Sequence, residues 1–326
     1  MKATNDLVYF IVVNFNASSI IEECLNSILS QDYKTFKILI VDNKSTDRSV
    51  DLIRKRYPNL KLITLDKNYG FARANNIAVN RIRKENPGFF VFINTDVIID
   101  SRWLSSCVRF LTDNQYEFAQ SIITNYESME TIDSLGIGIS RHLKIYDRKS
   151  GQSLSAKNND KTIFGPCFAA AIFKREVIEL LSGEHKFLNE EFNTFYEDVD
   201  CCFRANYNGF KAGLLSIPLS KHRRSFTADR QPFRKYFFIG RNYFLILGKH
   251  IPLGIFLKNL VWIILDRFVF LLNSIKQPSF FFGFLIGSFF GILKIINKIL
   301  LSERHAQGKM RYKTEVLDKI KRGFYA

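Results

Sequence analysis

The sequence is poor in cysteine and lacks the cysteine spacings that indicate a zinc site or a disulfide framework. Its 326 residues contain five cysteines, an odd number, and no Cys-x-x-Cys pair. Secreted disulfide-bonded domains and structural zinc modules carry more cysteines in regular pairs. We therefore expect buried or incidental thiols in a reducing cytosol, with neither cross-links nor a thiolate metal site.

Two glycine-rich signatures of nucleotide binding are also absent. No Gly-x-Gly-x-x-Gly follows the first apolar run, and the nearest approach, Gly136-Ile137-Gly138, continues into Ser140 and Arg141 instead of a third glycine. No loop ends in Gly-Lys-Ser or Gly-Lys-Thr. A nucleotide bound by this chain would therefore be held by side chains and carboxylates, and not by a glycine cradle.

The beginning of the chain lacks the features of a secretory leader. Met1–Asp6 is polar, and the apolar run Leu7–Val13 is short and leads directly into Asn14. A signal peptide needs a longer apolar segment followed by small residues at a cleavage site. We expect no signal peptide, and the run predicts a buried strand.

Acidic residues are scarce in the last third of the chain. From Arg204 onward there are 22 Lys and Arg against five Asp and Glu, a net charge of +17, although the whole chain carries +16. Many of the 32 phenylalanines lie in the same region. Nucleic-acid binding would explain the charge but not the apolar bulk, whereas an anionic membrane surface explains both. We expect a membrane partner and no nucleic-acid partner.

Two long apolar stretches lie in this basic region, Ile251–Ile275 and Ser279–Leu301. A helix that crosses a bilayer needs about 20 predominantly apolar residues, and the second stretch offers 15 before Lys294. The pattern favours helices that lie in the membrane interface or re-enter it, with a hairpin through the bilayer as the alternative. We divide the chain into an N-terminal domain, residues 1–230, and a basic, Phe-rich, membrane-associated helical region, residues 231–326.

In the N-terminal domain, short apolar runs alternate with amphipathic stretches. This alternation is typical of an α/β fold with a mostly parallel central sheet flanked by helices. The expected strands are Val8–Val13, Lys37–Val41, Lys61–Leu65, Phe89–Ile93 and Gly213–Ile217, the last ended by Pro218. The expected helices are Ser19–Leu29, Asp47–Arg56, Phe71–Ile82, Lys174–Leu181 and the second part of Glu190–Tyr207. Residues 124–162 are polar and irregular, which predicts loops or a hairpin over the cleft.

Three of these strands end in a polar cluster: Asn14-Phe15-Asn16, Asp42-Asn43-Lys44-Ser45 and Asn94-Thr95-Asp96. The carboxyl ends of parallel strands meet at one edge of the sheet, so the clusters should converge on a single cleft. Asp96 is placed to hold a divalent cation against phosphate oxygens, since hard cations take carboxylate ligands. The alternative is that Asp96 and Asp42 only cap the helices that follow them.

Two later features would complete such a site. Glu197-Asp198-Val199-Asp200 lies near the start of a helix, where a carboxylate can act as general base toward a substrate hydroxyl. The alternative is an internal ion pair between Glu197 and Arg204 on one helix face. His222 follows the last strand and is either a metal ligand or a structural histidine.

Together these motifs resemble the family 2 inverting glycosyltransferases of the GT-A fold, in particular their bacterial rhamnosyltransferase-like branch. The resemblance covers about Val8–Arg241, and Arg241-Asn242 matches a pair often found where these enzymes pass into membrane-associated helices. The motifs occur in the family's order. They are Val12-Val13-Asn14-Phe15-Asn16, Val41–Asp47, Asn68-Tyr69-Gly70-Phe71-Ala72 with Asn75, Asn94-Thr95-Asp96, Glu197-Asp198-Val199-Asp200 and His222.

The resemblance implies a role for each matching residue in a Rossmann-like, GT-A catalytic domain. The residues implied in donor binding are Asn14, Asn16, Asp42, Asn43, Asn68, Gly70, Asn75, Asn94, Thr95 and Asp96. Asp96 and His222 would hold Mg²⁺ or Mn²⁺, and Asn94 stands where the family has a second acid. Asp198 would be the catalytic base. The residues implied on the acceptor side are Gly165, Pro166, Cys167 and Glu197.

The implied reaction is one in-line displacement that inverts the anomeric carbon. The resemblance favours dTDP-rhamnose as donor, then a UDP-sugar, and a glycan or polyprenyl-diphosphate-linked acceptor. It implies cell-surface polysaccharide synthesis at the cytoplasmic face of the cell membrane, with a homo-oligomeric state left open. The alternatives are a sugar-phosphate nucleotidylyltransferase, which would need a glycine-rich loop after the first strand, and a catalytically inactive membrane scaffold.

Overall fold

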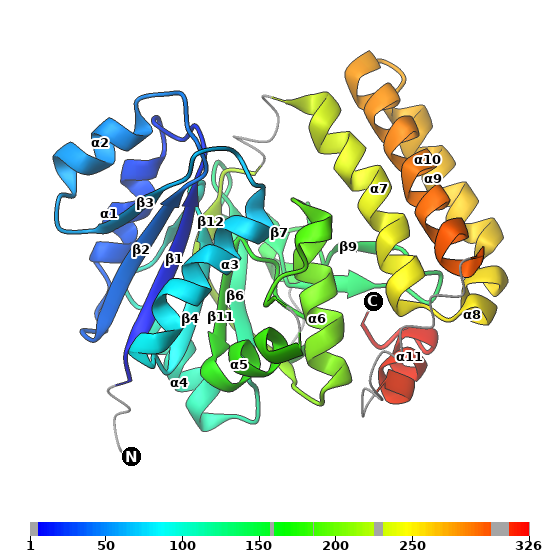
Figure 1. Ribbon diagram of the computed structural model, residues 1–326. Helices are drawn as coiled ribbons and strands as arrows, with labels where there is room; N and C mark the ends of the chain where they lie inside the picture. The colour runs from blue at the N-terminus through cyan, green and yellow to red at the C-terminus, as the bar shows by residue number, and fades with distance from the viewer. Residues whose placement is uncertain (1–5, 157–159, 185, 225–230, 301–312, 326) are drawn as a thin grey trace.

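The computed structural model describes residues 6–156, 160–184, 186–224, 231–300 and 313–325. It confirms an α/β fold in which helices cover both faces of one large sheet (Figure 1). The strands are β1 Val8–Asn14, β2 Phe36–Asp42, β3 Lys61–Thr64, β4 Phe89–Asn94, β5 Val97–Ile99, β6 Phe118–Asn125, β7 Ile132–Ser134, β8 Ile137–Ile139, β9 Ile145–Asp147, β10 Thr162–Ile163, β11 Ala170–Lys174 and β12 Ala212–His222. The helices are α1 Ile21–Leu29, α2 Ser49–Arg56, α3 Phe71–Ile82, α4 Trp103–Asp113, α5 Arg175–Glu184, α6 Glu197–Tyr207, α7 Pro232–His250, α8 Leu253–Lys258, α9 Leu260–Ser274, α10 Pro278–Leu300 and α11 Lys313–Lys321. The five cysteines are free thiols, as expected.

The sheet has the strand order β10-β12-β6-β11-β4-β1-β2-β3, with β5 added to β12 and β7 to β6. The run β3-β2-β1-β4 is parallel, as predicted from the alternating apolar and amphipathic segments. The other half is mixed, because β11 is antiparallel to both β4 and β6, whereas β12 is parallel to β6. Residues in the polar segment 124–162 form the small hairpin β8-β9.

The inner parallel strands β1, β2 and β4 are buried on both faces, which explains their apolar sequences. On β1, Val8, Phe10 and Val12 belong to the core shared with α1 and α4. The alternate residues Tyr9 and Ile11 belong to the core shared with α3, α5 and α6. Helices thus occupy both faces of the sheet, and the loops at its carboxyl edge are left to form a site.

The prediction that Pro218 ends the last strand is wrong. β12 continues to His222, with shifts in its pairing with β6 on both sides of Pro218. Proline cannot donate a ladder hydrogen bond, and an irregularity of this kind lets a strand accommodate it. The extra residues carry His222 to the edge of the sheet, where it pairs with Val97 of β5.

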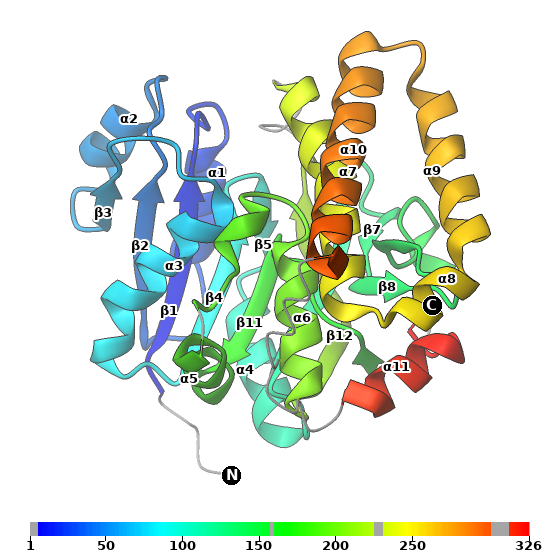
Figure 2. The ribbon, with the colours of Figure 1, turned by 45° about the vertical axis from the view of Figure 1, so that its right-hand side comes forward.

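The C-terminal helices form a separate layer in which α7 and α10 pack along their lengths and α9 lies beside α10 (Figure 2). Three glycines at every fourth position of α10 make the α7 contact close, as in helix pairs with small residues at the interface. A Cβ on any of them would come within 2.6 Å of an α7 carbonyl oxygen. The glycines are Gly283, Gly287 and Gly291, and the carbonyls belong to Phe233, Phe237 and Arg241.

The outer faces of α9 and α10 are apolar and exposed. In the described part of the chain, one helical segment, Pro278–Ile296, is long and apolar enough to cross a membrane, with a mean hydropathy of 2.0. The exposed apolar residues are Val261, Trp262, Ile264, Leu265, Phe268, Val269 and Leu272 on α9, and Phe282, Leu285, Ile286, Phe289 and Phe290 on α10. An apolar surface of this size needs a partner.

The last described helix, α11, returns to the N-terminal domain and packs on α6 (Figure 1). Beyond it, the backbone N–H of Ile139 donates to the carbonyl of Tyr325 at 3.1 Å. The Tyr325 ring is buried against Phe164, with ring centroids 5.3 Å apart. Part of the region 231–326 therefore belongs to the core of the N-terminal domain.

Candidate active site

A cavity of about 900 Å³ lies where β1 and β4 end, and it is closed by the β8-β9 hairpin, the start of α6, and α7 and α9. The expectation that the strand-end clusters converge on one cleft is confirmed. The predicted site residues that line the cavity are Asn43, Asn68, Gly70, Asn94, Thr95, Asp96, Cys167, Glu197, Asp198 and His222.

Asn14 and Asp42, at the ends of β1 and β2, lie buried behind the cavity wall and do not line it. The Asn14 amide donates to Asp42 Oδ1 at 2.7 Å, and the Asp42 carboxylate also accepts from Ser45. Asn16 accepts a hydrogen bond from the backbone N–H of Thr46 at 2.7 Å. These residues brace the loops after β1 and β2, and their predicted contact with a donor stays a prediction.

Asn75, Gly165 and Pro166 were also predicted as site residues, and they do not line the cavity either. Asn75 is buried in α3 and donates to the carbonyl of Phe71 at 2.9 Å. Gly165 lies so close to Cys202 of α6 that a Cβ would meet that side chain. Here the structure shows packing, and the predicted donor and acceptor roles of the three residues stay predictions.

Gly70 lines the cavity for a backbone reason. Its φ of +83° is one that residues with a side chain rarely adopt, and a Cβ would come within 2.6 Å of Asn193. The Asn193 amide in turn donates to the carbonyl of Tyr69 at 3.3 Å. The loop before α3 and the loop before α6 therefore meet directly at this wall of the cavity.

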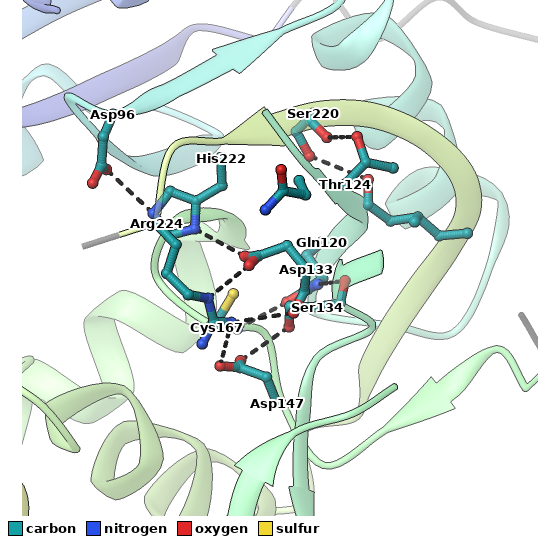
Figure 3. A network of polar contacts seen from close by, with 12 residues as sticks. Asp96, Gln120, Thr124, Asp133, Ser134, Asp147, Cys167, Ser220, His222 and Arg224 are labelled. Carbon is teal, nitrogen blue, oxygen red and sulfur yellow. Dashed lines mark hydrogen bonds and ion pairs between the residues drawn. The ribbon is translucent and has the colours of Figure 1, made fainter. Parts of the chain in front are cut away.

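His222 links two carboxylates across the cavity (Figure 3). Its Nε2 lies 3.3 Å from Oδ1 of Asp96, and its Nδ1 lies 2.9 Å from Oδ2 of Asp133. The N–H of Arg223 donates to the carbonyl of Asp96 at 2.9 Å, which fastens the turn after β4 to the end of β12. The Asp96 carboxylate thus contacts His222, and the alternative that Asp96 only caps a following helix is wrong.

Asp133 was not predicted from the sequence, because it is a lone acid in a segment assigned to loops. It lies on β7 and is nearly fully buried. The Arg224 guanidinium donates to Asp133 Oδ1 at 2.6 Å and to Asp147 Oδ2 at 2.8 Å. The wall is thus a row of alternating charges, and only the pairing of β7 with β6 brings Asp133 to His222.

These neighbours keep His222 protonated. Burial lowers the pKa of His222, but the hydrogen bonds and charges of Asp133 and Asp96 outweigh it and raise this pKa to about 9. Burial likewise raises the pKa of Asp133, and the hydrogen bond and charge of His222 more than compensate, so this pKa is lowered overall. The hydrogen bonds of the two acids thus stabilise the protonated form of His222.

No group of three or more His, Cys, Asp or Glu side chains suited to a metal occurs among the described residues. A metal ion would have to displace the proton of His222 Nε2, and Asp96 and His222 would then offer one carboxylate oxygen and one imidazole nitrogen at adjacent positions. The bond from Asp133 to the other ring nitrogen is the outer support that metal-bound histidines usually have. Mg²⁺ is commonly held by one or two protein groups with substrate phosphates and water, so these two residues fit such an ion.

Glu197 and Asp198 begin α6 after a loop with unusual backbone angles. Asn193, Phe195 and Tyr196 have φ values of 63°, 65° and 68°, which are rare for residues other than glycine. Backbone strain of this kind persists only where surrounding contacts hold it. Both carboxyl groups line the cavity.

The predicted alternative, an ion pair between Glu197 and Arg204, is wrong. Arg204 Nε instead binds Asp200 at 2.8 Å inside the protein, where His250 also contacts the Asp200 carboxylate at 2.9 Å. Glu197 is buried, and its Oε2 has no hydrogen-bond partner among the described residues.

The two neighbouring acids differ in ionisation. Burial raises the pKa of Asp198 to about 6, and the charge of Asp147 adds to this, against a hydrogen bond of 2.8 Å from the N–H of Val199. Burial, and next the charge of Asp198, raise the pKa of Glu197 well above its usual value. Both shifts favour the protonated forms, and the shift is the larger for Glu197, as in other carboxyl pairs that share a site.

The chain is similar to known proteins in sequence and in fold. The teichoic acid poly(glycerol phosphate) polymerase of Staphylococcus epidermidis is 29% identical over 201 residues, covering 60% of this chain and 25% of that protein. S. aureus TarS in complex with UDP-GlcNAc matches with a TM-score of 0.56 at 17% identity, covering 97% of this chain and 90% of that one. The mannosyltransferase PcManGT from Pyrobaculum calidifontis, in complex with GDP-Man and Mn²⁺, matches with a TM-score of 0.51 at 18% identity, covering 97% and 85%.

The two structural likenesses show that the fold is of the GT-A type. The chain spans about a quarter of the length of the staphylococcal polymerase. A model described as glycosyl transferase family 2 matches residues 9–181, more than half of the sequence. This match sets aside the nucleotidylyltransferase alternative, and the chain belongs to glycosyl transferase family 2.

Proposed function

We propose that this glycosyltransferase moves a sugar from a nucleoside diphosphate donor to an acceptor hydroxyl with inversion of the anomeric carbon. The observation that carries the proposal is the meeting of Asp198 and Glu197 with Asp96 and His222 in one cavity, although about 100 residues separate Asp96 from Asp198. A base and an anion-stabilising group in one cavity are what a single displacement requires.

In this mechanism the ionised Asp198 accepts the proton of the acceptor hydroxyl as its oxygen bonds to the anomeric carbon. The bond from that carbon to the diphosphate oxygen breaks in the same step, so no covalent intermediate forms. Glu197, whose raised pKa favours its protonated form, donates a hydrogen bond that orients the acceptor. Asp96 and His222 would hold Mg²⁺ or Mn²⁺, which when bound neutralises charge on the departing diphosphate.

The donor is proposed to carry a pyrimidine nucleotide. The rhamnosyltransferase-like motifs favour dTDP-rhamnose, and a UDP-sugar comes next. TarS was solved with UDP-GlcNAc and PcManGT with GDP-Man, so both donors belong in the comparison. Four of the predicted donor residues line the cavity, namely Asn43, Asn68, Asn94 and Thr95.

We propose a polyprenyl-diphosphate-linked glycan as acceptor, in cell-surface polysaccharide synthesis at the cytoplasmic face of the membrane. The support is the exposed apolar face of α9 and α10 together with the basic composition of the region. Such a surface binds a bilayer by apolar insertion and by attraction to anionic headgroups.

The test is transfer by the purified chain from dTDP-rhamnose, UDP-glucose, UDP-GlcNAc and GDP-mannose to a lipid-diphosphate sugar, with Mg²⁺ or Mn²⁺. We expect nucleoside diphosphate release coupled to a product of inverted configuration, seen by mass spectrometry and NMR. Asp198→Asn should lower kcat by about 10²- to 10⁴-fold, the usual contribution of a general base, while donor binding by calorimetry persists. The control is Asp51→Asn on the exposed side of α2. Turnover by Asp198→Asn near the wild-type rate would overturn the mechanism.

A further inference from the structure

Helix α9 carries its charged residues on the inner side and its apolar residues on the outer side. Asp266 and Arg267 are its charged residues, and their side chains are 22% and 13% exposed. The flanking residues Leu265 and Phe268 are 48% and 54% exposed. A helix on a protein–water surface has the opposite arrangement. Ionisable groups on the inner face of an apolar helix need partners there and commonly mark a functional site.

Two partners of Arg267 lie on α7 and directly before α6. The guanidinium lies over the buried ring of Tyr243, with Cζ 4.1 Å from the ring centroid. The Tyr243 ring in turn meets the ring of Tyr196 edge-on, with centroids 6.4 Å apart. Burial raises the pKa of Tyr196, and the charge of Arg267 and a side-chain hydrogen bond with it oppose this rise. Arg267 therefore contacts Tyr196 both directly and through Tyr243.

Tyr196 sets the direction in which α6 begins. Its φ of 68° is rare for a residue with a side chain, and its carbonyl accepts a hydrogen bond from the N–H of Asp200 at 3.0 Å, in the first turn of the helix. Its side chain lines the cavity beside Glu197 and Asp198. Such a backbone conformation persists only where surrounding contacts hold it. A change in the contacts of the Tyr196 ring would therefore turn the start of α6 and move the Asp198 carboxylate.

The same group of residues also holds the β8-β9 hairpin that closes the cavity. The Tyr243 hydroxyl donates to the carbonyl of Leu143 at 3.2 Å, and Nζ of Lys144 lies 3.5 Å from Oδ1 of Asp266. Leu143 and Lys144 belong to the turn between β8 and β9, and α9 rises beside this hairpin (Figure 2). The other carboxylate oxygen of Asp266 accepts from Nε of Arg267 at 3.0 Å. The Arg267 guanidinium thus lies between the contacts that fasten the hairpin and the contact that fastens α6.

We propose that Arg267 is a positioning residue for glycosyl transfer, which acts through Tyr196 and Tyr243 to hold the start of α6 where Asp198 meets the acceptor hydroxyl. This inference rests on the proposed function. General-base catalysis requires the base within hydrogen-bond reach of the hydroxyl, and a small displacement of either group costs much of the rate. The layer that carries the exposed apolar face is then also part of the framework of the active site.

The test compares Arg267→Gln, Tyr196→Phe and the double variant in steady-state transfer assays in detergent. We expect each single variant to lower kcat by about tenfold or more, with a smaller change in the KM of the donor. The double variant should be about as slow as the slower single variant, because both changes break the same contact, whereas independent losses would multiply. Arg267→Lys keeps the charge and should recover part of the lost kcat. Arg54→Gln, at an exposed position of α2, removes the same charge and should keep the wild-type kcat.

Hydrogen exchange gives a second measurement that requires no transfer. In Arg267→Gln and Tyr196→Phe, the amides of Val199 and Asp200 should exchange at least about tenfold faster than in the wild type, while those of α3 keep their protection. Faster exchange confined to the start of α6, in a protein that transfers no sugar from any donor, would leave the contact between α9 and α6 standing and refute the proposed function.

Two outcomes would overturn the inference while the proposed function stands. One is a loss of kcat that multiplies in the double variant, and the other is wild-type kcat and wild-type exchange in either single variant. Melting curves check that Arg267→Gln folds. If it does not, Tyr196→Phe, which removes one hydroxyl group, decides by the same two measurements.

Discussion

At the scale of residues, Asp198 and Glu197 are neighbours in the chain, and burial raises the pKa of both carboxyl groups. The charge of Asp198 raises the pKa of Glu197 further. General-base catalysis needs Asp198 ionised. Its pKa is raised to about 6, so the active form predominates above that pH and is lost as the pH falls through it. We expect kcat/KM to fall about tenfold per pH unit below about pH 6.

The measurement is a pH profile of kcat/KM for transfer, with the wild type and Glu197→Gln compared. Glutamine resembles the protonated acid that the raised pKa of Glu197 favours, so the variant should keep measurable activity and an acid limb. A profile that stays flat down to pH 4.5 would show that no group with the raised pKa of Asp198 limits the reaction.

Asp133 offers a second residue-scale prediction. It supports the Nδ1 side of His222, and outer partners of this kind typically contribute 10- to 100-fold to metal affinity or activity. Asp133→Asn should therefore raise the Mn²⁺ concentration for half-maximal transfer by about that factor. Asp113→Asn at the end of α4 is the control, and melting curves should show both variants folded. An unchanged Mn²⁺ requirement for Asp133→Asn would remove His222 from the metal site.

The sequence was informative about residues at strand ends and poor for residues placed by long-range pairing. Asn43, Asn94 and Asp96 could be predicted to share a cleft, because parallel strands deliver their carboxyl ends to one edge. Asp133 and Arg224 could not, since their positions depend on β7 pairing with β6 and on β12 passing through Pro218. No local pattern in the chain encodes those pairings.

At the scale of elements, α1, α2 and α3 were predicted closely, and α3 matches its expected bounds, Phe71–Ile82. Helix α4 was not predicted, although one of its faces is apolar and buried. The strands β6 and β11 were not predicted, because each is buried in a mixed part of the sheet where apolar runs do not reveal direction. Residues 232–250 were assigned to a basic, Phe-rich helical region from their composition. That they form the single helix α7 was not predicted.

The helix α7 also holds the loop that carries the catalytic pair. The buried amide of Asn242 donates to the carbonyls of Phe192, Thr194 and Phe195 at 2.8 to 2.9 Å. Loss of these bonds would release the loop whose backbone angles aim Glu197 and Asp198. Asn242→Ala should lower kcat by about tenfold or more with a smaller change in the KM of the donor, because this loop meets the predicted donor residues only through Asn193 beside Tyr69 and Gly70.

Steady-state kinetics on Asn242→Ala and on Asn208→Ala measure this effect. Asn208 is exposed at the end of α6, and its amide donates to one helix carbonyl, that of Arg204 at 2.8 Å. We expect the Asn208 variant to keep its kcat. Equal losses in the two variants would indicate general destabilisation instead of a misaligned loop.

At the scale of the whole molecule, the apolar face of α9 and α10 predicts binding to bilayers. Leu265→Asp/Val269→Asp places two charges one helical turn apart on exposed positions of α9 and should weaken binding to anionic liposomes by at least about tenfold. The check is liposome co-sedimentation at low and high salt. Leu29→Asp/Leu180→Asp, at exposed positions of the N-terminal domain, is the matched control.

Undiminished sedimentation of the α9 variant would refute binding through this face. The division of the chain at residue 230 stays a prediction at this scale. The structure adds that Tyr325 and α11 are packed into the domain that the division would separate from them. Point substitutions on α9 are therefore a cleaner test than removal of the C-terminal region.

The return of α11 to α6 has a topological consequence. Both α7 and α11 contact α6, so the chain leaves the N-terminal domain after α7 and comes back to it. Any bilayer crossed by the segment between them is crossed an even number of times, none or two. If Pro278–Ile296 alone crossed the bilayer, α11 would lie on the opposite side from α6, the helix that it packs against. The N-terminal domain and α11 therefore lie on the same side of any membrane that α9 and α10 contact.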